Sequence, residues 1–131
     1  MIFVDTSVWV AAFRAGDGLE ARTLRHLLDQ DEVGLPIPVR IEILAGASSE
    51  DRTRLRKALS ALPVYYPGAA TWRLVDSWLA PAASAGKRFG LTDLLIGALA
   101  AEHEGVLWSL DSDFRRMASI GFVTLFEPAP S

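Results

Sequence analysis

Met1-Ile2-Phe3-Val4-Asp5-Thr6-Ser7 opens the chain with an apolar run that ends at a carboxylate followed by two hydroxyl residues. A continuous apolar run of this length predicts a strand of a buried parallel sheet. Open α/β sheets bind ligands at the carboxyl ends of their strands, which is where Asp5 would lie. The alternative is that Asp5 caps the helix that follows, a position that favours Asp, Thr and Ser. The other carboxylates of the chain decide between these two interpretations.

The composition is that of a globular protein. The chain has 131 residues, of which 50% are hydrophobic and 22% charged, and its length predicts one domain over residues 1–131. It contains no cysteine, which excludes disulfides, thiolate metal sites and thiol catalysis. The two histidines, His26 and His103, lack the spacing of a zinc site. Any bound metal should therefore be a hard cation with oxygen ligands.

Targeting and membrane signals are not evident in the sequence. No basic segment precedes the first apolar run, which meets Asp5 after four residues, so a secretory signal is not expected. No uncharged apolar stretch reaches the roughly 18 residues that a membrane-spanning helix needs. We therefore expect a soluble, cytoplasmic protein.

Helix and strand patterns alternate along the chain. Strands are predicted at residues 1–4, 33–35, 106–110 and 122–126, and helices at about 8–13, 19–30, 37–47, 49–59, 69–79 and 93–103, with a helical turn from 113. The stretch 58–72 is interpreted as a loop, Pro81 as the end of a helix, and Ser49 and Thr92 as helix caps, with a frayed tail after Glu127. The crossovers are too long for hairpins, so the fold class is α/β with a parallel sheet covered on both faces.

Five carboxylates are predicted to converge on one cleft. Asp5 and Asp111 each follow an apolar strand and so share one edge of the sheet, with Asp113 two residues further on. Glu42 lies on a helix face with little bulk around it, and Asp93 opens another helix, where the helix dipole favours a carboxylate. If Asp5 belongs to this site, the capping role falls to Thr6 or Ser7.

A simpler interpretation exists for most of these acids. Asp93 fits the start of a helix, and Asp111 and Asp113 fit a polar turn that closes a strand. Glu42 lacks such an alternative, because Arg40 is too close in sequence to share its helix face and an unpaired buried charge is unfavourable. The agreement of all these positions on one end of one sheet favours a functional site.

Clustered carboxylates repel one another, and a divalent cation relieves that repulsion. Mg²⁺ and Mn²⁺ bind carboxylates together with water and substrate phosphate, an arrangement suited to hydrolysis of a phosphodiester. Outside the five acids the bases slightly outnumber the remaining acids, which fits an enzyme acting on a polyanion. Arg88 and Arg115 are the best candidates for phosphate contacts, the alternative being ordinary solvated arginines.

With these motifs identified, the chain resembles the PIN-domain ribonucleases, in particular the VapC toxins of bacterial type II toxin–antitoxin modules. The resemblance covers essentially the whole chain. It rests on Asp5-Thr6-Ser7, on Ile-Glu-Ile-Leu-Ala-Gly at 41–46, on Thr-Asp-Leu-Leu-Ile-Gly-Ala at 92–98 and on Ser-Leu-Asp-Ser-Asp-Phe at 109–114. Ser109 stands where the family often has Thr, and either hydroxyl could orient a neighbouring carboxylate.

The resemblance implies a three-layer α/β/α sandwich around a short parallel sheet and a Mg²⁺- or Mn²⁺-dependent endoribonuclease acting on tRNA or rRNA. It makes Asp5, Glu42, Asp93 and Asp111 the catalytic acids and Asp113 an accessory, so we expect Asp5, Asp93, Asp111 and Asp113 to hold the ion. It also implies a homodimer and a cognate VapB-type antitoxin that inserts a segment into the cleft.

Two other functions are compatible with parts of this pattern. A catalytically idle PIN module that binds RNA or protein would be favoured by loss of an acid, and none is lost here. A phosphatase of the haloacid-dehalogenase type also begins with an Asp after its first strand. It needs a second Asp two residues on, where this chain has Ser7.

Overall fold

A parallel sheet lies at the centre of the fold, which we describe from a computed structural model for residues 1–129. Its strands are β1 (Ile2–Val4), β2 (Val33–Pro36), β3 (Val64–Tyr65) and β4 (Val106–Trp108), in the spatial order β3-β2-β1-β4. All pairings are parallel, and Ile2 lies between Val33 of β2 and Val106 of β4. The predicted parallel sheet is confirmed, with the N-terminal run of the chain as a central strand.

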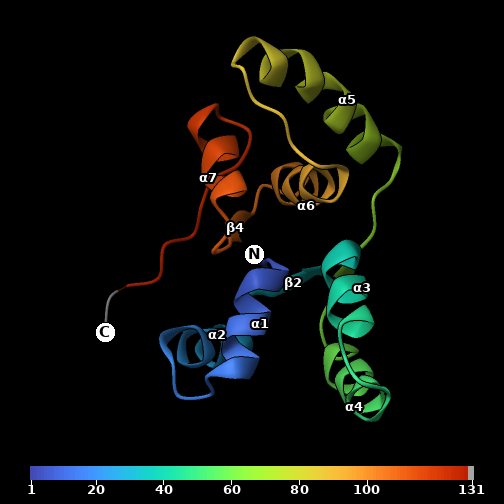
Figure 1. Cartoon of the computed structure of the whole chain (residues 1–131), viewed down its shortest axis with the longest axis vertical. Coiled ribbons are helices and arrows are strands. Elements are labelled where there is room, and N and C mark those ends of the chain that lie inside the picture. Colours follow the sequence, from blue (N-terminus) through green and yellow to red (C-terminus); the bar gives the residue numbers. More distant parts are fainter. Residues whose placement is uncertain (130–131) are drawn as a thin grey trace.

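Helices cover both faces of this sheet, as the α/β prediction requires. They are α1 (Thr6–Arg14), α2 (Leu19–Asp29), α3 (Ile37–Ala45), α4 (Ser49–Leu59), α5 (Ala69–Ser84), α6 (Leu91–Glu102) and α7 (Ser112–Ser119). In Figure 1, α5, α6 and α7 gather on one side of the strands and α1 and α2 on the other. The result is a three-layer α/β/α arrangement.

The two strongest apolar patterns of the sequence form the centre of the hydrophobic core. Phe3 and Val4 of β1 are completely buried, as expected for a continuous apolar run in a parallel sheet. Ile96 and Leu99 of α6 are also completely buried, which fits a helix that is apolar nearly all round. Asp5 directly follows β1 and Asp93 lies in the first turn of α6, so the buried residues of these two elements fix the positions of both acids.

The stretch 58–72 is not only a loop, since it contains β3. Leu35 pairs with Val64 and Pro36 with Tyr65, so this two-residue strand forms one edge of the sheet. The prediction missed it because a strand of two residues shows no alternating pattern. The predicted end of α5 at Pro81 is also wrong, since the helix continues to Ser84. Because Pro81 has no backbone N–H, the carbonyl of Ser77 has no helical hydrogen-bond donor. Both residues are exposed, so water can bind that carbonyl and the helix continues.

Several predicted boundaries differ from the structure. Ser48 and Gly90 cap α4 and α6 in place of Ser49 and Thr92. Residues 122–126 form a single bridge, Leu107 to Leu125, rather than a strand. The predicted frayed tail is described only to residue 129, and residues 130–131 lie outside the described residues. No helix within residues 1–129 has the length and apolar character needed to cross a membrane.

Candidate functional site

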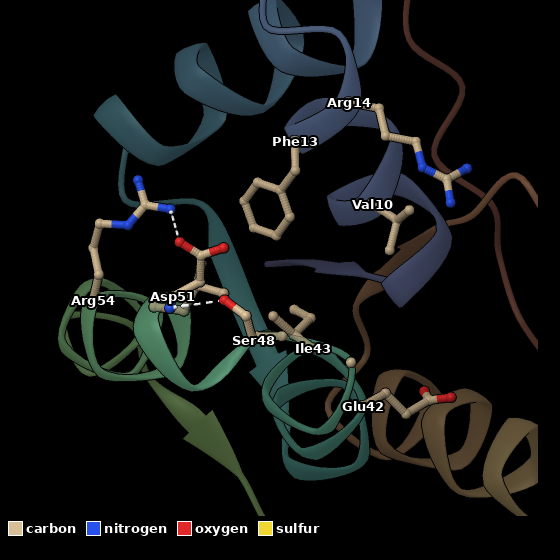
Figure 2. Close-up of a pocket in the computed structure, with 11 residues that line it drawn as sticks. Val10, Phe13, Arg14, Glu42, Ile43, Ser48, Asp51 and Arg54 are labelled. Carbon is tan, nitrogen blue, oxygen red and sulfur yellow. Dashed lines mark hydrogen bonds and ion pairs between the residues drawn. The ribbon is translucent and has the colours of Figure 1, made fainter.

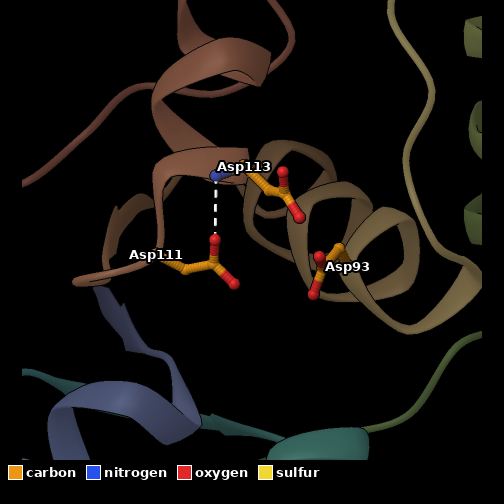
Figure 3. Close-up of side chains that lie close together, drawn as sticks. All are labelled: Asp93, Asp111 and Asp113. Atoms are coloured by element: carbon orange, nitrogen blue, oxygen red, sulfur yellow. Dashed lines mark hydrogen bonds between the residues drawn. The ribbon is translucent and has the colours of Figure 1, made fainter.

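Three aspartates at the start of α6 and α7 point into one space. One carboxylate oxygen from each of Asp93, Asp111 and Asp113 lies within 4.8 Å of the others. Asp93 comes from the first turn of α6, whereas Asp111 and Asp113 come from the start of α7 (Figure 3). Carboxylates this close together repel, so the arrangement favours a cation between them.

Asp111 reaches this position because it ends the loop after β4 and caps α7. Its Oδ1 accepts a hydrogen bond of 2.9 Å from the backbone N–H of Asp113. Asp111 is thus a helix cap and not part of a polar turn that closes β4, since Asp113 is already in the first turn of α7. This cap does not conflict with a place in the cluster. A carboxylate has two oxygens, and only one of them is used by the cap.

Asp5 also caps a helix. It is the N-cap of α1, and its Oδ2 accepts from the backbone N–H of Ser7 at 3.4 Å. The prediction that Thr6 or Ser7 takes the capping role is wrong, because the helix begins at Thr6 and its cap is the residue before it. Asp5 is only 6% exposed, and its backbone N–H donates to the carbonyl of Trp108 at the end of β4. The pairing of β1 with β4 thus brings Asp5 to the edge of the sheet where Asp111 emerges.

Two serine hydroxyls hold the buried carboxylate of Asp5. Ser7 Oγ and Ser109 Oγ each donate to Oδ2 of Asp5 at 2.8 Å. Each oxygen also accepts a backbone N–H from the loop after β4, Ser7 from Leu110 at 3.0 Å and Ser109 from Asp111 at 2.9 Å. Each hydroxyl has one proton, and both protons go to Asp5. The pair therefore ties the loop that carries Asp111 to the end of β1.

Glu42 belongs to α3, a different helix from those that carry the three clustered aspartates. It lies on the exposed face of α3, and its Oε1 accepts a hydrogen bond of 2.8 Å from Thr6 Oγ1. It also lies at the edge of a pocket of about 500 Å³ between α1, α3 and α4, with Arg54 on the opposite side in Figure 2. This role of Thr6 was not predicted from the sequence, although its position directly after Asp5 already pointed to the site.

The neighbouring acids act on the carboxyl group of Asp93. The pKa of Asp93 is raised to about 6, first by burial of its carboxyl group and then by the negative charges of Asp111, Asp5 and Glu42. The four acids that the sequence picked out, contributed by two strand ends and two helices, are therefore close enough to interact. Asp113 joins them through its contact with Asp93 and Asp111.

The arginines are arranged differently from the prediction. Arg88 is exposed in the connection between α5 and α6 and makes no ion pair within residues 1–129. Arg115 forms an ion pair of 3.3 Å with Glu127, which is not one of the clustered acids. Arg116, the next residue, instead forms an ion pair with Asp113. The arginine that contacts the cluster is thus not one of the two that sequence reasoning preferred.

The donor atoms of this site fit one kind of metal. All of the clustered side chains offer carboxylate oxygens, and neither a thiolate nor an imidazole belongs to the group. Hard divalent cations such as Mg²⁺ and Mn²⁺ prefer such ligands. Asp93, Asp111 and Asp113 are close enough to share one ion, and Asp5 and Glu42 are near enough to affect its charge balance.

Comparisons with known proteins show what the chain is similar to. Residues 2–120 match the PIN domain. VapC ribonuclease Mb1587 of Mycobacterium bovis and ribonuclease VapC11 of Mycobacterium tuberculosis are each 33% identical over 125 residues, covering 92% of this chain and 93% of the relative.

Solved structures with the same fold are less similar in sequence. VapBC2 from Rickettsia felis, solved with a promoter DNA fragment, matches with a TM-score of 0.79 and 20% identity over 96% of this chain and 98% of that one. FitAcB from Neisseria gonorrhoeae matches with a TM-score of 0.78 and 21% identity over 98% of both chains. At these identities the likeness concerns the fold.

Proposed function

The chain belongs to the PIN-domain family and, within it, to the VapC ribonuclease toxins of type II toxin–antitoxin systems, and from this premise we propose that it is a Mg²⁺- or Mn²⁺-dependent endoribonuclease. Its proposed reaction is hydrolysis of RNA phosphodiester bonds by residues 1–131 acting as one domain. The observation that carries the proposal is the group of carboxylate oxygens from Asp93, Asp111 and Asp113 within 4.8 Å of one another.

The proposed metal ligands are Asp93, Asp111 and Asp113, with Asp5 beside them. A bound ion would supply a Lewis acid that activates water and stabilises the charge developing on the phosphate. The chain contributes rigid placement of the ligands, because Asp111 is fixed by its helix cap and Asp5 by two serine hydroxyls. Those hydroxyls occupy Oδ2 of Asp5 and leave Oδ1 for the ion.

Glu42 has a different proposed role. Its Oε1 is held by Thr6, and its Oε2 is left to accept a proton from the attacking water. A carboxylate on the exposed side of the cleft suits this task, since it keeps access to solvent for the proton that it takes. We therefore propose Asp5, Glu42, Asp93 and Asp111 as the catalytic acids, with Asp113 as the accessory ligand.

Cleavage by the purified protein tests this proposal. A panel of tRNA and rRNA is incubated with Mn²⁺, Mg²⁺ or EDTA, and the ends of the products are sequenced. We expect cleavage that needs the divalent ion and is lost in Asp93→Asn. A folded wild-type protein that binds RNA but cuts none of the panel would instead support the idle binding module. Cleavage retained by Asp93→Asn would show that the metal ligands are assigned wrongly.

We further propose a homodimer and a VapB-type antitoxin partner, acting in the cytoplasm. The solved structures that this chain resembles include toxin–antitoxin complexes. The pocket between α1, α3 and α4 supports the proposed antitoxin partner, because Phe13 at its edge is 52% exposed and Glu42 also lines it. An antitoxin segment seated there would cover Glu42. Co-expression with the antitoxin should abolish cleavage, and sedimentation of the free protein should give the mass of a dimer.

A further inference from the structure

Arg116 is the cationic side chain that lies against the acidic cluster. It is on α7, one turn after Asp113, and its guanidinium forms an ion pair with Oδ1 of that residue. The other ion pairs found within residues 1–129 involve acids outside the cluster. The site therefore has a built-in positive group at one edge, next to a carboxylate that is also placed to hold an ion.

The ion pair leaves Asp113 with free acceptor sites and Arg116 with free N–H donors. Asp113 meets Arg116 through Oδ1, and a carboxylate has lone pairs on both oxygens, so it keeps acceptor capacity for an ion shared with Asp93 and Asp111. The guanidinium has five N–H donors, and the Arg116 side chain is 50% exposed. Some of its donors are therefore open to a ligand that approaches the cluster from solvent.

We propose that Arg116 is a substrate-binding residue that contacts the phosphate of the RNA held at the ion. This inference rests on the proposed ribonuclease function. Metal–oxygen contacts are about 2 Å and N–H···O contacts about 3 Å long. The path from the guanidinium through the Asp113 carboxylate and the ion to a phosphate oxygen is therefore at most about 9 Å long. Because this path bends at the carboxylate and at the ion, the phosphate oxygen would lie closer to the guanidinium than that. The ion pair also holds the guanidinium in place, which reduces the entropy lost on binding.

The neighbouring arginine offers a direct comparison. Arg115 is on the same helix, is similarly exposed, and is paired with Glu127 instead of an acid of the cluster. The simpler explanation for Arg116 is an ordinary ion pair between residues three apart on a helix, which would stabilise α7 and do nothing for RNA. A measurement of RNA binding separates the two explanations, because a purely structural pair does not change the number of phosphates contacted.

The experiment compares Arg116→Gln, Arg115→Gln and, as a control on an exposed face of α4, Arg56→Gln. Binding of a fluorescein-labelled RNA oligonucleotide of mixed sequence is followed by anisotropy with Ca²⁺ in place of Mg²⁺, over a series of KCl concentrations. We expect Arg116→Gln to bind about tenfold more weakly and to lose about one phosphate contact from the salt dependence. Arg116→Lys should recover part of the affinity, and Arg56→Gln should match the wild type.

Parallel measurements on the wild type keep the two proposals distinguishable. Mn²⁺ binding and RNA cleavage are measured on the same preparations. If the wild type cuts RNA while Arg116→Gln keeps its affinity and salt dependence, the inference about Arg116 is wrong and the ribonuclease function stands. Loss of affinity in Arg115→Gln alone would move the phosphate contact to that residue. A wild type that neither binds Mn²⁺ nor cuts RNA would overturn the ribonuclease function and, with it, the role of Arg116.

Discussion

Thr6 donates a hydrogen bond of 2.8 Å from its Oγ1 to Oε1 of Glu42, and this contact joins the first turn of α1 to α3. Glu42 is exposed, so little packing restricts its side chain. A single hydroxyl therefore does much to decide where this carboxylate points. Since Thr6 follows Asp5 directly, the end of β1 positions two acids. Asp5 is held by its own backbone, and Glu42 is held by the hydroxyl of Thr6.

Thr6→Val should reduce RNA cleavage about fivefold and leave the folded structure intact. Valine keeps the branched shape and removes the hydroxyl, and a hydrogen bond of this kind contributes about 1 kcal/mol. Thr6→Ser is the matched control and should retain most of the activity, because it keeps the donor. The variants are compared by initial cleavage rates at saturating Mn²⁺, with thermal unfolding to check the fold. Equal rates for Thr6→Val and the wild type would show that this contact does not position Glu42 for the reaction.

Metal affinity should rise with pH through about 6. The pKa of Asp93 is raised to about 6 by burial and by the charges of Asp111, Asp5 and Glu42. Below that pH a proton on Asp93 competes with the cation, and above it the carboxylate is free to bind. Titration with Mn²⁺ at several pH values, followed by calorimetry, should show the change. A Mn²⁺ affinity that is constant between pH 5 and pH 7.5 would contradict it.

The stability of the metal-free protein should fall as the pH rises, whereas the metal affinity rises. A folded-state pKa of about 6 lies above the ordinary value of 3.8, so the folded state binds the proton more tightly than the unfolded state. The contribution of Asp93 to stability is therefore complete below pH 3.8 and is lost as the pH rises through 6. Asp93→Asn removes this titration, so the stability gained by the variant over the wild type in EDTA should grow between pH 5 and pH 7.5. A difference in melting temperature that stays constant over this range would argue against a raised pKa.

The sequence predicted the sheet and the placement of its acids because these depend on strong local patterns. The apolar runs before Asp5 and Asp111 are long enough to identify β1 and β4, and parallel pairing then brings the two strand ends together. The third element, α6, is apolar nearly all round and could only be buried. The convergence of Asp93 with these acids followed from that reasoning.

What the sequence did not predict depends on contacts between residues far apart in the chain. The two-residue strand β3 exists because β2 offers an open edge, which no local pattern indicates. The sequence suggested that the Ser109 hydroxyl orients a neighbouring carboxylate, but its convergence with Ser7 on Asp5 became visible only once β1 and β4 were adjacent. The pair of Arg115 with Glu127 also depends on the fold, whereas Asp113 and Arg116 are three residues apart on one helix, so their pairing could have been predicted from the sequence.

Two substitutions of Asp111 should separate its role as a helix cap from its proposed role as a metal ligand. Asp111→Asn keeps a side-chain oxygen that accepts from the N–H of Asp113, and Asn is a good N-cap, so α7 should stay stable. Asp111→Ala removes the cap and should lower the stability by about 1 kcal/mol relative to Asp111→Asn. Both should lose the rise in melting temperature that Mn²⁺ gives the wild type. If Asp111→Asn kept that rise, Asp111 would not be a ligand.

Gly105→Ala should strongly destabilise the fold without touching the acidic cluster. A Cβ at this position would overlap the ring of Phe3, which is completely buried, and would lie 2.9 Å from the carbonyl oxygen of Met1. Neither neighbour is free to move, since Phe3 is buried in β1 and the Met1 carbonyl accepts a hydrogen bond of 3.2 Å from the backbone N–H of Val106. Overpacking of this kind costs about 1–3 kcal/mol. Gly16→Ala is the control, because a Cβ there meets nothing within 4 Å. Urea unfolding should give a lower midpoint for Gly105→Ala alone, and equal midpoints for the two variants would mean that β1 and the start of β4 are less tightly packed than the structure indicates.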